Sequence, residues 1–564
     1  METRRFILAL SLSLVVFILY VRFFAPKPSE KQTMPEPAKQ EAVTAKTEQP
    51  KTTSMHPGAV AGGIEPAAQG KVIVVETDLL KAEVNTAGGV ITHWELKHYR
   101  EADKTEHGLG VLFAKIMGRA RKEETPKKEL GNVQLVPTYE GVNATEMVAP
   151  LTLAPLDKEL YKLSKVQFQA DHDALRLSKD KPSETLVLTY TGPAGLSIEK
   201  KLTFYNDDYK VDVAVTTRGI DGYTLSLGTD FGIADKVSKD ASGRVGLVSL
   251  MDGKLITDKL NSIKGETQFA GAIDWFGQED KYFTATIISG GNGIVTSRKT
   301  AEPKEIGDLL TTDLTVKEKP EARMFTLYAG PKSFTLLQAH GHGLDQMVDY
   351  GWFGILAKPM FWLLTKFYAI TKNYGIAIIL LTIVVRLIMF YPSLKSATAM
   401  EEMKKIQPQL MAVREKYKKD PNRMNQEMMK LYKDHKVNPL GGCLPMVLQL
   451  PFFVALYNVL SVSIELRQSP FISFWIKDLS VFDPFYILPV LMGVSMIFTM
   501  KMTSTTPDPQ QAKIMMFMNI AFIFLFAWLP AGLLLYITLS NVLSIVQQLY
   551  VRKLIGAAPA AAGK

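Results

Sequence analysis

Most sequence patterns that mark ordinary enzyme chemistry are missing from this chain. Its 564 residues include one cysteine, Cys443, so no internal disulfide can form, and the cysteine count says nothing about compartment. No GxxxxGKS/T, HExxH, GxSxG or paired CxxC pattern occurs. Ordinary nucleotide, zinc or hydrolase chemistry therefore has no support in the sequence, and we expect no cofactor and no metal.

Apolar residues are spread unevenly, which indicates a multi-domain membrane protein. A length of 564 residues is too large for one ordinary core. Uncharged stretches are concentrated in residues 6–21 and after residue 373. The chain is therefore expected to combine soluble and membrane parts.

The N-terminal segment, residues 1–25, starts with basic residues and continues as an apolar run. A cleaved signal peptide is one reading, but Phe rather than a small residue lies two places before Ala25, which makes a poor cleavage site. An uncleaved transmembrane anchor is favoured, with Arg4 and Arg5 holding the N-terminus in the cytoplasm. Residues 26–70 contain seven prolines and no aromatic residue, which predicts a disordered linker.

In residues 71–340, apolar and polar residues alternate with a period of two. Short alternating runs such as KLTFY, KVDVAVT and RMFTLYAG lie between Gly, Asp and Asn turns. Many strands without regular intervening helical patterns predict an all-β sandwich domain. Its place after an anchor with a cytoplasmic N-terminus puts it on the extracytoplasmic side.

Residues 341–372 carry a helical pattern instead. Apolar positions between residues 353 and 370 recur at steps of three and four, and the lysines fall outside this seam. Such a segment is too charged to span, so it predicts an amphipathic helix at the membrane surface, kinked at Pro359. A helix packed on the β domain is the alternative.

The region 373–550 is predicted to be a transmembrane core, followed by a cytoplasmic tail, residues 551–564. Its spans are expected near 374–392, 440–463, 485–500, 514–529 and 531–549. With the N-terminal anchor they make six, which returns the C-terminus to the cytoplasm. The charges agree, because the loop 393–437 has eleven Lys or Arg against six Asp or Glu, whereas 464–484 has two against three.

Arg386 lies in the middle of the apolar run 374–392, which contains no acidic residue. Such a charge at the bilayer centre costs about 2.5–3.5 kcal/mol on insertion scales and about 10–17 kcal/mol in calculations on isolated helices. Something polar must therefore meet it: water, another helix or a passing ligand. Pairing with backbone carbonyls and lipid phosphate is the alternative.

Other polar side chains of the spans could line a wet, positively charged cavity with Arg386. Thr382 lies one turn earlier on the same helix, and other spans supply Gln449, Asn519, Tyr536 and Asn541, none of them acidic. Ordinary interhelical hydrogen bonding, worth about 0.6 kcal/mol on average, is the alternative for each polar residue taken singly.

The loop 393–437 is predicted to form a cytoplasmic helical hairpin. Apolar positions recur at three and four on two arms, and KKDPN, residues 418–422, turns the chain. The excess of basic residues suits anionic phospholipid head groups or ribosomal RNA. Seven methionines between residues 400 and 446 would suit a surface that adapts to many partners.

Seven segments lie in order over about residues 350 to 550. They are VVRLIMFYP, KIQPQL, EMMKLYK, VNPLGGCLPMVLQLPFFVALY, ELRQSPF, DPFYILPVLMG and WLPAGLLLYITLSN. In sequence, order and spacing they resemble the YidC/Oxa family of membrane protein insertases. The additional anchor and β domain look like the Gram-negative form. There VETDLLKAEVNTAGGVITHWEL resembles the first strands of a periplasmic β-supersandwich.

The resemblance implies an insertase and chaperone for nascent inner-membrane proteins, which acts without nucleotide hydrolysis, alone or with the Sec translocon. In that family a groove open to cytoplasm and lipid holds the family's arginine, here Arg386, and receives the polar end of an incoming segment. Some relatives have two tyrosines in the last span, where this chain has Tyr536 followed by Ile537.

The resemblance also implies that the hairpin recruits the nascent chain or the ribosome, and the signal recognition particle receptor is a further candidate partner. Recruitment would fall to Met403, Lys404, Lys405, Arg414, Met424, Met428 and Met429.

Two other functions fit parts of the sequence. A transporter or channel would suit the spans, but no paired repeats and no acidic coupling residues are evident in them. A carbohydrate-binding or mutarotase-type module on a membrane anchor would suit the β domain, although fold analogy alone supports it.

Overall fold

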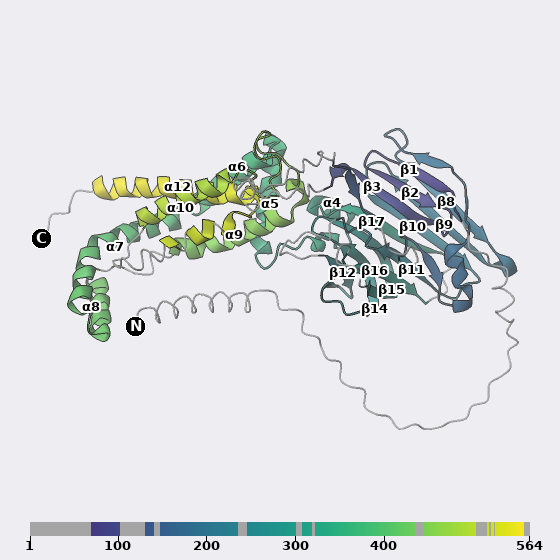
Figure 1. Cartoon of the computed structure of the whole chain (residues 1–564), viewed down its shortest axis with the longest axis horizontal. Coiled ribbons are helices and arrows are strands. Elements are labelled where there is room, and N and C mark those ends of the chain that lie inside the picture. Colours follow the sequence, from purple (N-terminus) through teal and green to yellow (C-terminus); the bar gives the residue numbers. More distant parts are fainter. Residues whose placement is uncertain are drawn as a thin grey trace, which may run out of the picture. The chain divides into compact units, whose positions relative to one another are not determined.

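The computed structural model describes residues 69–101, 130–139, 147–234, 245–300, 307–317, 322–435, 437, 444–503, 516–517, 520–523 and 525–557. The predicted anchor, the predicted linker up to residue 68 and the tail from residue 558 lie outside this part. Figure 1 shows strands in the purple to teal part of the chain and helices in the green to yellow part.

The first sheet has five strands in the order β4-β3-β2-β1-β7. They are β1 (Val72–Glu76), β2 (Leu80–Asn85), β3 (Val90–Arg100), β4 (Asn132–Gln134) and β7 (Ala174–Arg176). Neighbours run antiparallel except β1 and β7, which are parallel. In β2 every second residue is buried, as the two-residue period predicts for a strand with one face on the core.

The second sheet has twelve strands, of which nine follow the order β13-β12-β14-β15-β17-β10-β9-β8-β6, while β11, β16 and β5 pair beside this path. Their bounds are β5 (Leu153–Pro155), β6 (Gln169–Ala170), β8 (Ser183–Thr191), β9 (Ser197–Tyr205), β10 (Lys210–Arg218), β11 (Tyr223–Thr229), β12 (Gly246–Met251), β13 (Lys254–Lys259), β14 (Glu266–Glu279), β15 (Phe283–Thr300), β16 (Leu309–Val316) and β17 (Arg323–Pro331). Short 3-10 helices lie at Lys158–Lys165 and Pro193–Gly195.

The two sheets share a core. Trp94 on β3 is fully buried, and its Nε1 donates to the carbonyl of Ala329 on β17 at 3.0 Å. Its indole also packs edge-on against Phe231, with ring centroids 5.9 Å apart. The expectation of a β-rich domain before the helices is confirmed.

Lys200 is a charged residue at a core position of this domain. On β9 the side chains of Ile198, Lys200, Leu202 and Phe204 alternate inward, and Lys200 is fully buried. Its Nζ donates to three backbone carbonyls, those of Gly88 and Gly89 at 2.9 Å and of Leu151 at 2.8 Å. The lysine therefore ties the second sheet to the turn that joins β2 and β3.

The stability of the β domain should depend on pH through Lys200. Burial lowers the pKa of this lysine from 10.5 to about 7, so above pH 7 the unfolded chain binds more protons than the folded one. Stability then rises with pH between about 7 and 9.5, by up to about 1.4 kcal/mol per pH unit. Lys200→Met should remove this slope. Hydrogen exchange of β9 peptides in the full chain, corrected for the intrinsic pH dependence of exchange, measures this slope. Equal slopes in the wild type and in Lys200→Met would show that Lys200 is not its source.

The helices follow the β domain. They are α4 (Phe334–His340), α5 (Gly354–Thr371), α6 (Tyr374–Ile388), α7 (Phe390–Lys416), α8 (Pro421–Asp434), α9 (Leu444–Val462), α10 (Ile487–Thr503) and α12 (Ala531–Ala557), with 3-10 turns at Leu344–Met347 and Ile464–Leu466. Helix α6 begins at an N-cap, because the Asn373 side chain accepts a hydrogen bond from the amide of Ile376 at 3.1 Å.

Helices lie at four of the five spans predicted for residues 373–550, but their lengths differ from the predicted ones. By length and apolarity, Ala531–Val551 of α12 can cross a membrane, and α6 with α7 passes as a pair bent by 64°. The apolar segments Leu448–Val462 and Ile487–Met500 are shorter than the roughly 20 residues of a typical span. The predicted span 514–529 lies partly outside the described residues. Six spans therefore remain a prediction.

The helix expected at the membrane surface is α5, which continues through Pro359 as one element. Its buried residues are Ala357, Met360, Phe361 and Leu364. Phe361 packs against Phe334 of α4, with ring centroids 5.8 Å apart. Ile370 was expected among the apolar positions of this helix that face inward, but it is 79% exposed. The buried face of α5 is the one that carries Ala357, Met360 and Leu364. Helix α5 thus has an inward face, while its location at a membrane surface stays a prediction.

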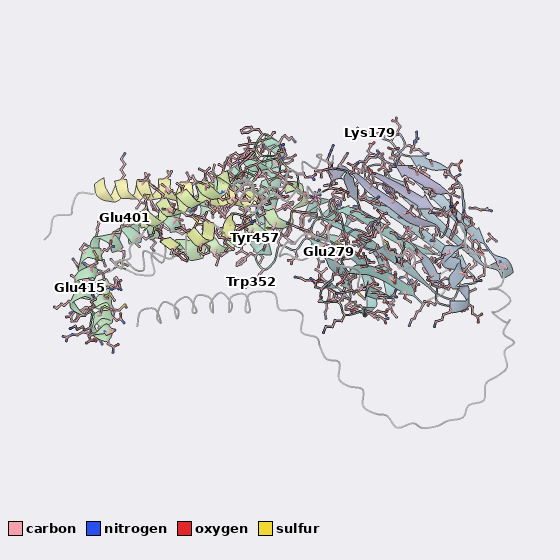
Figure 2. The ribbon with its side chains drawn as sticks, viewed as in Figure 1. Lys179, Glu279, Trp352, Glu401, Glu415 and Tyr457 are labelled. Carbon is pink, nitrogen blue, oxygen red and sulfur yellow. The ribbon has the colours of Figure 1, made fainter. Side chains whose placement is uncertain are left out.

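Helices α7 and α8 pair through an apolar seam of their own. Met403, Ile406 and Leu410 of α7 are buried together with Val437, and Met428, Leu431 and Tyr432 of α8 pack against them. Figure 2 labels Glu401 and Glu415 on α7. The turn between the helices is capped by Asp420, whose side chain accepts from the amide of Arg423 at 3.1 Å.

Candidate functional site

Arg386 lies in a small pocket formed by four helices. The residues that line it with Arg386 are Val385 and Met389 at the end of α6, Ser393 of α7, Leu448, Gln449 and Phe452 of α9, and Tyr536 of α12. The cavity volume is about 10 Å³, room for about one water molecule. The pocket thus brings polar groups of different helices to one cation.

Arg386 donates hydrogen bonds to two neutral groups. Its Nη2 donates to the backbone carbonyl of Ser540 at 2.6 Å and to Oε1 of Gln449 at a longer 3.5 Å. None of the residues that line the pocket is acidic. The guanidinium is therefore hydrogen-bonded, while its charge meets no carboxylate in this lining.

The predicted groove residues divide into two groups. Gln449 and Tyr536 line the pocket with Arg386, and Tyr536 is almost fully buried. The Thr382 hydroxyl instead donates to the carbonyl of Ile378 at 2.6 Å and is fully buried. The Asn541 amide donates to Oγ of Ser495 on α10 at 3.1 Å. Asn519 lies outside the described residues.

The sequence interpretation missed two contributors to the pocket. One is the Ser540 carbonyl, because a backbone acceptor leaves no signature in residue type. The other is the break at Met389, which separates α6 from α7 and brings Met389 and Ser393 to the pocket. Pro392 in the first turn of α7 was the available signal, since proline is tolerated there but not in a helix interior.

The predicted recruitment residues differ in how far they are exposed. Met403 is buried in the seam between α7 and α8, and Met428 packs against that seam. Lys405 and Met429 are exposed, and Lys404, Arg414 and Met424 are half-buried. Among these methionines, Met429 is therefore the one that offers most of its side chain to a partner.

A buried carboxylate positions α10. Asp483 is fully buried and accepts three hydrogen bonds, from Nε1 of Trp475 at 2.8 Å and from the amides of Phe485 at 3.0 Å and Leu488 at 2.7 Å. Leu488 lies in the first turn of α10, where amides have no partner within the helix and a negative charge is favourable. Asp483 thus holds the loop before α10 and the start of that helix together.

Gly375 on α6 permits a close approach of the same loop. A Cβ built at this position would lie 2.0 Å from Cδ2 of Phe471, far inside any allowed contact. The side-chain Nδ2 of Asn373 donates to the Phe471 carbonyl at 3.0 Å. The start of α6 and the loop before α10 are therefore closely packed.

Metal ligation has no candidate in the described ranges. No group of three or more His, Cys, Asp or Glu side chains there could hold a metal ion.

Two family models together cover most of the chain. The model of the 60Kd inner membrane protein family matches residues 366–558, and that of the YidC periplasmic domain matches residues 123–363. The first match includes Arg386 and the helices that line its pocket. The second includes much of the β-rich domain.

Curated relatives match almost from end to end. The membrane protein insertase YidC of Geobacter metallireducens is 35% identical over 99% of each chain, and that of Geotalea daltonii is 34% identical over 98% of this chain and 99% of its own. A crystal structure of an active YidC insertase with its first transmembrane domain resolved shares 19% identity, covering 88% of this chain and 96% of that one with a TM-score of 0.36. The chain therefore belongs to the YidC family of membrane protein insertases.

Proposed function

We propose that this chain inserts nascent proteins into the bacterial inner membrane and assists their folding, without nucleotide hydrolysis. The observation that carries the proposal is the Arg386 pocket, in which a cation meets a carbonyl and an amide but no acidic lining residue. A transport protein that couples to ions would be expected to place acidic residues at such a site. The relatives' name as insertases supports the same conclusion.

In the proposed mechanism the pocket belongs to a hydrophilic groove that opens to cytoplasm and lipid. Arg386 gives the polar end of an incoming segment a transient partner, in exchange for the Ser540 carbonyl. Widening of the pocket would admit more water, which shortens the apolar distance that the polar end has to cross. Burial of the segment's own apolar surface then drives insertion, at roughly 25 cal/mol per Å².

The proposed topology has six spans, both termini in the cytoplasm and the β domain in the periplasm. The hairpin of α7 and α8 is then cytoplasmic and meets the ribosome, the signal recognition particle receptor or anionic phospholipids. The Sec translocon is a proposed partner for some substrates. The basic excess of residues 393–437 supports this orientation.

Helix α5 is proposed to lie at the periplasmic membrane surface. Outward side chains near and along it include Trp352 at 73%, Ile355 at 88% and Trp362 at 60% exposure, and the Lys366 ammonium lies 5.8 Å from the Trp362 ring centre. Exposed tryptophan beside lysine suits the interface between head groups and acyl chains.

Photocrosslinking to a stalled nascent chain tests the proposal. A photoreactive aromatic residue at Tyr536 or Met389, which line the pocket, should capture the polar tail of a single-span substrate. The same probe at Leu387, on α6 but 67% exposed and outside the pocket lining, should capture that tail much less. Equal capture at all three positions, or none at Tyr536, would show that the pocket does not receive the substrate.

A further inference from the structure

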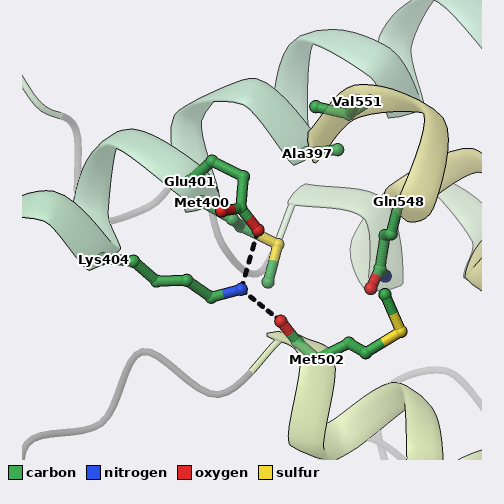
Figure 3. A pocket seen from close by; sticks show the side chains of 7 residues that line it. All are labelled: Ala397, Met400, Glu401, Lys404, Met502, Gln548 and Val551. Carbon is green, nitrogen blue, oxygen red and sulfur yellow. Dashed lines mark hydrogen bonds and ion pairs between the residues drawn. The ribbon is translucent and has the colours of Figure 1, made fainter. Parts of the chain in front are cut away.

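A second small pocket lies where α7 meets α10 and α12 (Figure 3). It is lined by Ala397, Met400, Glu401 and Lys404 of α7, Met502 of α10, and Gln548 and Val551 of α12. The α7 residues recur at steps of three and four, so they share one helix face. Ser393, which lines the Arg386 pocket, lies one turn before Ala397 on this face. The two pockets therefore follow one another along α7.

Lys404 joins two helices in the second pocket. Its Nζ contacts Oε1 of Glu401 at 2.7 Å and also donates to the backbone carbonyl of Met502 (Figure 3). Met502 lies near Thr503, where the described part of α10 ends. The donor to its carbonyl comes from a lysine 98 positions earlier in the chain. The bond therefore links α7 directly to α10.

The other end of the same helix face is fixed from α12. The Gln547 amide donates to the carbonyl of Phe390, the first residue of α7, at 3.2 Å. Lys404 is fourteen residues further on, about 21 Å along the helix. Between these two ties α7 passes from the Arg386 pocket to the hairpin. Gln548, the neighbour of Gln547, has a buried Oε1 without a hydrogen-bond partner among the described residues.

We propose that Lys404 is a positioning residue, which fixes the first arm of the hairpin against α10 at Met502. The tie is the bond to the Met502 carbonyl, whereas Glu401 orients the ammonium. Both side chains are about four-fifths buried, at 21% and 22% exposure, so the lysine is turned toward the pocket rather than offered to a ribosome. This inference concerns where the arm lies and does not depend on what the hairpin recruits.

Hydrogen exchange of the full chain in nanodiscs tests the inference. Lys404→Met should speed exchange about five- to tenfold in the turns of α10 around Met502, since a charge-assisted bond to that carbonyl is lost. Lys404→Arg should preserve protection, because the guanidinium still donates. Glu401→Gln should change it less than about twofold, because the glutamine Oε1 can still accept from the ammonium. Lys405→Met, a change at the exposed neighbour, is the matched control.

The distance between α8 and α12 is a second measurement, which a local packing defect would not change. With Cys443 replaced by serine, spin labels at Met429→Cys and Tyr550→Cys, both about half exposed, report the distance between α8 and α12. Lys404→Met should broaden this distance distribution, and Lys404→Arg should restore it. The inference is overturned if Lys404→Met leaves exchange and distances unchanged, if Glu401→Gln matches its effect, or if α8 itself exchanges faster, which would mean that the hairpin has unfolded. Insertion is not the readout, so the insertase proposal can fail separately.

Discussion

Replacing Arg386 with methionine should slow the insertion of single-span substrates with acidic tails by at least about tenfold, the value of one charge-assisted hydrogen bond. It should not weaken the fold. The guanidinium has a carbonyl and an amide as partners and no acidic residue in the pocket lining, and an unpaired charge is expensive in an apolar span. We therefore expect equal or higher thermal stability in detergent. Insertion assays after depletion and complementation, together with thermal unfolding, measure both effects.

The side-chain chemistry at this position allows finer comparisons. Arg386→Lys keeps a positive charge but loses the planar fork, so partial activity is expected. Arg423→Met, an exposed arginine on α8, is the matched control and should change neither insertion nor stability. Wild-type insertion by Arg386→Met would refute the role of the charge. A large loss of stability in this variant would instead assign the arginine to the fold.

Asp483→Ala is expected to destabilise the helical region by about 3–5 kcal/mol, because three donors lose a buried charged acceptor. The donors are the Trp475 indole and the amides of Phe485 and Leu488. Asp483→Asn keeps one carbonyl oxygen, so roughly half of the loss is expected. Thermal unfolding in detergent, followed by tryptophan fluorescence that includes Trp475, measures the difference.

The matched control for Asp483 is in the same loop. Asp478 is half-buried, and its carboxylate accepts from the amide and hydroxyl of Ser480, two residues away. Asp478→Ala should therefore cost no more than about 1 kcal/mol, as for a local turn bond. Similar losses at both positions would mean that Asp483 does not organise the start of α10.

Periodicity predicted the β domain and the helix seams because burial follows a strand or helix period directly. The same alternation on β9 held a signal that the sequence interpretation did not use, since Lys200 occupies an inward position between Ile198 and Leu202. A lysine there must find acceptors, but its three carbonyls come from remote turns that the sequence does not bring together. Backbone acceptors that are remote in sequence cannot be predicted from a local pattern of residues.

The candidate site was partly predictable for a related reason. A lone arginine in an apolar run can be recognised from sequence, because placing its charge in the bilayer costs free energy. Gln449 and Tyr536 line its pocket. Thr382 shares the helix face, but threonine in a helix can satisfy its hydroxyl on the carbonyl four residues earlier, as it does here. The backbone partner Ser540 and the tie from Lys404 to Met502 depend on helix packing, which residue types alone do not specify.

The 64° break at Met389 makes α7 a lever. This helix has 27 residues and is therefore about 40 Å long. A rotation of about 10° at the break would carry its far end about 7 Å, while the side chains beside the break move by less than about 1 Å. A change in the Arg386 pocket of the size of one hydrogen bond is thus geometrically sufficient to redirect the hairpin once the bond from Lys404 to Met502 opens, because that bond holds α7 to α10 about 21 Å from the start of α7.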